Sequence, residues 1–174
     1  MTRDSLSLGD TMYTARQILV PVDFSDVSRA AISAALQIAA DHGGSVHLLF
    51  VEEGMNRDLK RRLDTAPQDS VIEDTIRLNE QSLLDAAELE FQRCIDAGAP
   101  LPPVPLKVHV MGGDWLEQIL ELARSLELDL VVTGTHGRKG VKGILTGSIS
   151  EKLVARSPCS VLVVKPHGFP YLRD

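Results

Sequence analysis

Aromatic residues are scarce in this chain of 174 residues, at 4% of all positions, although a surface that stacks nucleic-acid bases needs several of them. The net charge of −6 leaves no overall excess of positive charge for a phosphate polymer or an acidic membrane surface. No apolar run reaches the roughly 18 to 20 residues that a membrane-spanning helix requires. These deficits predict a cytoplasmic protein that binds neither nucleic acid nor membrane.

Cysteine is also rare. Cys94 and Cys159 are far apart in the sequence, and neither belongs to a CxxC pair or a Cys/His cluster. A zinc site is therefore not expected, and two cysteines in a chain of this length do not make a disulfide scaffold. We expect two buried, reduced thiols.

Short β-branched runs alternate along the chain with longer amphipathic stretches. The runs that predict strands are 17–23, 46–51, 105–110, 129–134 and 160–164. The stretches between them predict helices after Ser25, over 69–97, after Asp114 and over 148–156. Five strands and four helices in strict alternation predict an α/β fold with a doubly wound, five-stranded parallel sheet.

Single residues mark where the helices should begin and end. Ser25 is a candidate N-cap and Gly43 a candidate C-terminal residue of the first helix. Residues 52–67 have no apolar pattern and predict a mobile loop or a short surface helix. The apolar stripe expected on the helix over 69–97 consists of Ile72, Ile76, Leu83, Ala87, Phe91 and Ile95.

The common five-strand orders place the first strand beside the point where the winding reverses. Ligands of such sheets bind outside the carboxyl ends of the strands at that point. With the order 3-2-1-4-5, the first and fourth strands flank it. The topology therefore directs attention to Asp23 and to the segment after Thr133.

The segment from Gly134 to Gly147 holds five of the 13 glycines. It contains neither GxxxxGK[ST] nor GxGxxG, so the usual phosphate and dinucleotide motifs are absent. Glycines nevertheless let backbone N–H groups approach an anion, and Gly147 with Ser148 opens a predicted helix whose N-terminus favours negative charge. This loop is a candidate anion site.

Charge within the loop agrees with an anionic ligand, because three basic residues and no acidic one lie between Gly137 and Gly147. Each residue also has a structural alternative. Ser148 with Glu151 fits a capping box, and the basic side chains could simply be solvated. His136 alone could be a surface histidine, and Asp23 alone a residue favoured at a helix start.

Three signatures, in this order along the chain, resemble the ATP-binding branch of the universal stress protein family. They are Ile18-Leu19-Val20-Pro21-Val22-Asp23-Phe24-Ser25, the spacing Gly134-x2-Gly137-x9-Gly147-Ser148, and Ser157-Pro158-Cys159-Ser160-Val161-Leu162-Val163-Val164. The resemblance implies a Rossmann-like sheet of the adenine nucleotide alpha hydrolase-like type over residues 16–166. Residues 1–15 would be a flexible N-terminal tail and 167–174 a C-terminal tail.

The resemblance also implies a pocket for ATP, with Mg²⁺ or Mn²⁺ carried by the phosphates rather than by a cage of protein ligands. It assigns no catalytic residue. Asp23 would contact the nucleoside beside Pro21 and Val22, and Val51 would form an apolar wall for adenine. The phosphates would lie on two segments, comprising Gly134, His136 and Gly137, and Gly147, Ser148, Ile149 and Ser150.

The leading hypothesis is a cytoplasmic ATP-binding regulator of the stress response, a homodimer paired through 161–164 that acts on a protein partner not identified by the sequence. A slow ATPase or nucleotide-handling enzyme, with His136 or Asp23 in proton transfer, is the alternative from the enzyme class. A dimer module without nucleotide is another. A signalling receiver domain would need an aspartate after the third strand, where Met111-Gly112-Gly113 stands instead.

Overall fold

The computed structural model describes residues 13–52, 70–98, 101–135 and 149–165. Over these residues the chain alternates between strand and helix, as the sequence predicts. The elements are β1 (Gln17–Pro21), α1 (Asp26–His42), β2 (Ser45–Glu52), α3 (Ser70–Asp96), β3 (Leu106–Gly112), α4 (Trp115–Ser125), β4 (Leu130–Gly134), α5 (Ile149–Arg156) and β5 (Ser160–Val164).

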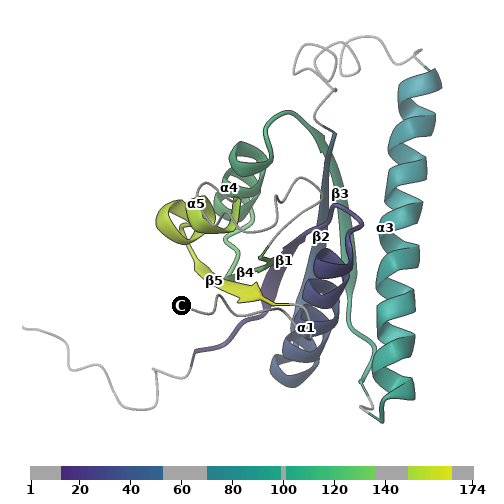
Figure 1. Ribbon diagram of the computed structural model, residues 1–174, viewed down its shortest axis with the longest axis vertical. Helices are drawn as coiled ribbons and strands as arrows, with labels where there is room; N and C mark the ends of the chain where they lie inside the picture. The colour runs from purple at the N-terminus through teal and green to yellow at the C-terminus, as the bar shows by residue number, and fades with distance from the viewer. Residues whose placement is uncertain (1–12, 53–69, 99–100, 136–148, 166–174) are drawn as a thin grey trace, which may run out of the picture.

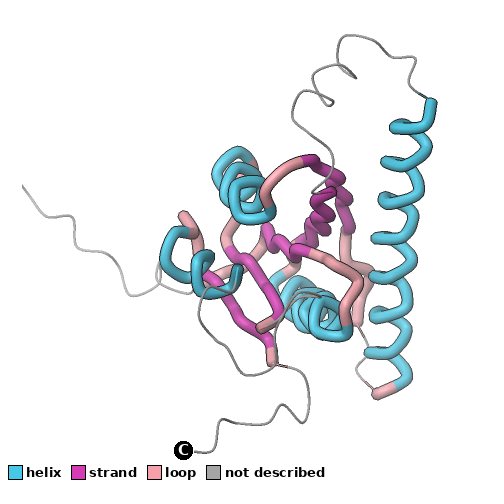
Figure 2. Tube along the Cα trace, turned by 45° about the horizontal axis from the view of Figure 1, so that its top comes forward, coloured by secondary structure: helices cyan, strands magenta, loops and turns pink. Residues whose placement is uncertain are grey.

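The five strands form one parallel sheet in the order β3-β2-β1-β4-β5, which confirms the predicted strand order. Helices α1 and α3 cover one face, and α4 and α5 cover the other (Figure 1; Figure 2 shows the same layers turned by 45°). Neighbouring residues of β1, such as Ile18 and Leu19, are fully buried in opposite layers. Burial on both faces explains why the central strands read as continuous apolar runs.

Helix α1 begins and ends at the residues that the sequence marks. The hydroxyl oxygen of Ser25 accepts the N–H of Ser28, satisfying one donor that the first helical turn leaves free. Gly43 follows the helix with φ of 64°, a left-handed conformation that glycine adopts without a Cβ clash. The first helix is therefore specified locally at both ends.

Helix α3 corrects one part of the predicted apolar stripe. Leu83 and Ala87 are buried against α1 and the sheet, as expected, but Ile95 is 40% exposed. Cys94 is buried in its place, because the contact face reaches position 94 seven residues after Ala87, two helical turns later. The prediction was based on which residues are apolar, and at the last turn of the helix the apolar residue Ile95 lies outside the contact face.

The two thiols differ in environment. Cys94, on α3, is buried, whereas Cys159, before β5, is half-buried; both are free. The expectation of two buried thiols is therefore right for Cys94 and wrong for Cys159. In the described part of the chain, no helix is long and apolar enough to cross a membrane.

Candidate functional site

The switch point, which we define as the carboxyl ends of β1 and β4, is where the predicted site residues of both strands converge. The two strands pair directly, with Ile18 opposite Leu130 and Leu19 opposite Val131. β1 ends at Pro21, two residues earlier than the sequence predicts, so Asp23 lies in the turn into α1. Val22 is still held to the sheet, because its N–H donates to Leu49 O over 2.8 Å.

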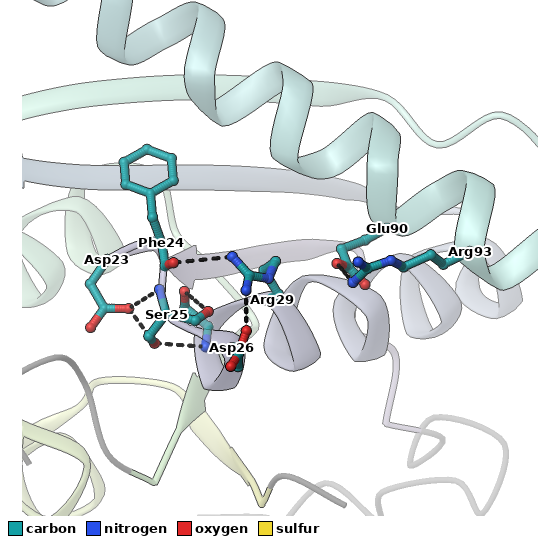
Figure 3. A network of polar contacts seen from close by, with 8 residues as sticks. Asp23, Phe24, Ser25, Asp26, Arg29, Glu90 and Arg93 are labelled. Atoms are coloured by element: carbon teal, nitrogen blue, oxygen red, sulfur yellow. Dashed lines mark hydrogen bonds and ion pairs between the residues drawn. The ribbon is translucent and has the colours of Figure 1, made fainter.

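The turn after β1 orients the Asp23 carboxylate. The backbone N–H of Ser25 donates to Asp23 Oδ1 over 3.1 Å, and the Ser25 hydroxyl donates to the same oxygen over 2.6 Å (Figure 3). The same hydroxyl oxygen caps α1. Ser25 therefore couples the start of the helix to the direction of the carboxylate.

A second contact closes this turn from the helix side. Phe24 has φ of 61°, a conformation that costs free energy in a residue with a Cβ atom. Its carbonyl oxygen accepts Arg29 Nη1 over 3.2 Å, and Arg29 also pairs with Asp26 (Figure 3). The strained residue is thus tied to the first turns of α1.

On the opposite side of the switch point, β4 ends at Gly134, where α1 leaves no room for a side chain. A Cβ atom there would lie 2.3 Å from Val27 Cγ1 and 3.0 Å from Val27 Cβ. The family resemblance implies that this residue is a phosphate-loop glycine. The structure gives it a packing role, whatever it does for a ligand.

Thr135 lies between Gly134 and His136, and the sequence patterns do not indicate it as a site residue. Its hydroxyl oxygen, Oγ1, is buried without a hydrogen-bond partner, and no other side-chain oxygen or nitrogen in the described part of the chain is in that state. Its backbone is held on both sides, by Thr135 N–H donating to Val164 O over 3.1 Å and by Ser150 Oγ donating to Thr135 O over 3.5 Å. Buried hydroxyls in native proteins nearly always have a partner. A polar ligand at the switch point would supply one to Thr135 Oγ1.

Val51 is 2% exposed near the end of β2, and an aromatic group adjoins it. The ring of Phe50 lies 5.3 Å from that of Phe24 and 6.0 Å from that of Trp115, the latter edge-on, both measured between ring centroids. Three of the few aromatic residues therefore gather near the carboxyl end of β2, and all three are half-buried. The low aromatic content gave no indication of this clustering.

The structure thus places part of the predicted site together. Four of its residues lie at the switch point, namely Pro21, Val22, Asp23 and Gly134. Val51 lies near the end of the neighbouring strand β2, and Ile149 and Ser150 begin α5. Ser150 is buried against Thr135, whereas Ile149 is 41% exposed. His136, Gly137, Gly147 and Ser148 lie outside the described residues, as do residues 53–69.

The acidic, histidine and cysteine side chains of the described residues form no group of three or more that could hold a metal ion. The site therefore consists of an oriented carboxylate, a buried unpartnered hydroxyl and the start of a helix. This set suits a polar ligand with hydroxyl and anionic groups.

Comparison with known proteins relates the chain to a family. The model of the universal stress protein family matches residues 14–165. Universal stress protein MJ0531 of Methanocaldococcus jannaschii is 28% identical over 158 residues, which cover 90% of this chain and 85% of that protein. The structure of universal stress protein UspA from Lactobacillus plantarum is 26% identical, with a TM-score of 0.55 over 87% of this chain and 98% of that one.

A third comparison concerns the fold alone. The crystal structure of a universal stress protein in complex with cAMP is 24% identical to this chain, with a TM-score of 0.59. The match covers 87% of this chain and 98% of that one.

Proposed function

Because the chain belongs to the universal stress protein family, we propose that it is a cytoplasmic ATP-binding regulator of the stress response that works as a homodimer. The observation that carries the nucleotide part is that an oriented carboxylate, at Asp23, follows β1 while a buried, unpartnered hydroxyl, at Thr135, follows the adjacent strand β4. The complex of a relative with cAMP supports an adenine nucleotide as the ligand class.

In this proposal the two halves of the nucleotide lie on different strands. Asp23 accepts hydrogen bonds from the nucleoside, and Val51 forms the apolar wall beside the base. The phosphates lie on the chain that follows Gly134, with the N-terminus of α5 favouring their negative charge. Mg²⁺ or Mn²⁺ arrives with the triphosphate and is held by phosphate oxygens and water.

The expected result for nucleotide-free protein is saturable binding of ATP in the presence of Mg²⁺, measured by calorimetry. Gly147→Val should abolish it, because a branched side chain prevents the backbone from approaching a phosphate. Absence of heat from the native protein at high micromolar concentration would contradict nucleotide binding and leave a dimer module without nucleotide. An unchanged affinity in Gly147→Val would instead remove this loop from the phosphate site.

Catalysis is tested in the same samples by release of inorganic phosphate. We propose at most slow hydrolysis of ATP. Steady turnover that is lost in His136→Ala while binding persists would assign an enzymatic function in place of a purely regulatory one.

We propose that dimers pair through β5. Its residues Val161 to Val164 are half-buried or exposed in the single chain, and Leu162 is 38% exposed, so a second copy would cover apolar surface and unpaired backbone groups together. Leu162→Lys should shift sedimentation from dimer toward monomer because it places a charge in that contact. A native protein that sediments as a monomer would rule the pairing out, and an unshifted dimer would place the interface elsewhere.

A further inference from the structure

Two histidines on neighbouring strands, His47 of β2 and His109 of β3, face each other on the α4 side of the sheet. His47 lies near the amino end of β2, away from the switch point. His47 Nδ1 lies 3.0 Å from His109 Nε2, and the ring planes differ by 3°. The ring centroids are 5.3 Å apart, which exceeds the nitrogen separation by about two ring radii. The rings therefore lie end to end in one N–H···N hydrogen bond, and no space remains for a metal ion between the facing nitrogens.

A glutamine decides which histidine donates. Gln17 Oε1 accepts the Ser45 hydroxyl over 3.1 Å and lies 2.9 Å from His47 Nε2. A carbonyl oxygen can only accept, so His47 carries its hydrogen on Nε2 and presents a lone pair at Nδ1. His109 Nε2–H must then be the donor. One chain of hydrogen bonds thus joins β1, β2 and β3.

The surroundings favour the neutral form of both rings. Burial lowers the pKa of His47 to about 4, with further lowering by His109 and by Lys107, its partner across the β2–β3 ladder. Burial and Lys107 also lower the pKa of His109. No opposite charge compensates from the covering helix: the residues of α4 buried on this face are uncharged, and its charged residues are exposed, namely Glu117, Glu121 and Arg124.

We propose that the His47–His109 pair is an acid-sensitive latch that holds the edge strand β3 on β2. A first proton can enter at His109 Nδ1 and leave the bond in place. A proton on His47 Nδ1 replaces the lone pair that the bond requires, so two N–H groups and two positive rings then face each other beside Lys107. The latch goes beyond nucleotide binding and does not depend on it.

The direction of the pH effect follows from the lowered pKa values. Unfolded histidines take up protons below about pH 6.5, whereas the folded pair resists them. The stability contributed by the pair is therefore complete above pH 6.5 and is lost as the pH falls toward 4. Each histidine that stays neutral in the fold makes unfolding about tenfold more favourable per pH unit over that window.

The test compares urea unfolding of the full chain between pH 7.5 and 4 in the native protein and in the double variant His47→Gln, His109→Gln. The amides keep hydrogen-bonding groups at both positions but cannot titrate. We expect the native protein to lose stability through the window and the double variant to lose much less. His167→Gln, which removes a histidine from the sequence that follows β5, is the matched control and should follow the native protein. His109→Gln alone should give an intermediate slope, and it supplies the measurement if the double variant does not fold.

Hydrogen exchange tests whether the effect lies in β3. The other edge strand, β5, contains no histidine and serves as the internal control. After correction for intrinsic rates, amides of β3 should lose protection between pH 6.5 and 4.5 more than those of β5, and only when both histidines are present. Equal pH dependence in native protein and double variant would overturn the proposal, as would acid loss of protection that spares β3. Stabilisation of the native protein by Zn²⁺ that the double variant lacks would assign the pair to a metal instead.

Discussion

Gly134→Ala is expected to destabilise the fold by about 1 to 3 kcal/mol, the usual cost of adding volume to a packed site. The new Cβ would lie 2.3 Å from Val27 Cγ1, and Val27 cannot simply rotate away because its Cβ and carbonyl carbon are 3.0 and 3.2 Å from the same point. Relief requires α1 to move from the end of β4. The measurement is the free energy of unfolding in urea, and Gly134→Val should cost more.

The same substitution can be relieved from the opposite side. Val27→Ala removes the methyl group at 2.3 Å but leaves the atoms at 3.0 and 3.2 Å, so the cost of Gly134→Ala should be smaller in the Val27→Ala background without disappearing. The double-mutant cycle measures that difference. An equal cost of Gly134→Ala in both backgrounds would show that its effect does not arise from the contact with α1.

Asp23→Ala is expected to weaken ATP binding by about ten- to a hundredfold, the range for loss of a hydrogen bond to a charged group. The reason is that Asp23 is the carboxylate aimed at the switch point by two donors of Ser25. Calorimetry with ATP and Mg²⁺ measures the change. An affinity equal to that of the native protein would exclude Asp23 from the nucleoside contact.

Variants of Ser25 separate the orientation of Asp23 from the capping of α1. Ser25→Asp retains an acceptor for the Ser28 N–H but repels the Asp23 carboxylate, so binding should weaken with little loss of stability. Ser25→Thr keeps both interactions and should restore both properties. Ser25→Ala should lower stability by about 1 kcal/mol as well as weaken ATP binding. If Ser25→Asp binds as the native protein does, the hydroxyl of Ser25 acts only as a helix cap.

The features that sequence could predict are the ones encoded over a few neighbouring residues. The capping hydroxyl of Ser25, the left-handed Gly43 and the uninterrupted apolar runs each have a local physical cause, and the order of alternation then restricts the topology. The prediction that Ile95 is buried is wrong because equivalent positions on the contact face of α3 are seven residues apart. That spacing leads from Ala87 to Cys94, and Ile95 lies one position further along.

The features that escaped prediction depend on distant residues meeting. Gly134 is required by Val27, more than a hundred positions away, so its packing role has no local signal. Thr135 becomes noticeable only when its hydroxyl is seen to be buried without a partner. The His47–His109 bond needs the β2–β3 register and the ring orientations, neither of which the sequence supplies.

The two edges of the sheet are chemically unequal, and this bears on how large an assembly can grow. At one edge β5 presents Val161 to Val164, and at the other β3 carries the exposed Lys107. If copies join through the β5 edge about a twofold axis, each copy contributes that edge once, and only β3 edges remain at the ends. A lysine there disfavours strand-to-strand addition of further copies. The asymmetry would therefore terminate growth at two copies, where a sheet with two apolar edges could extend into a fibre.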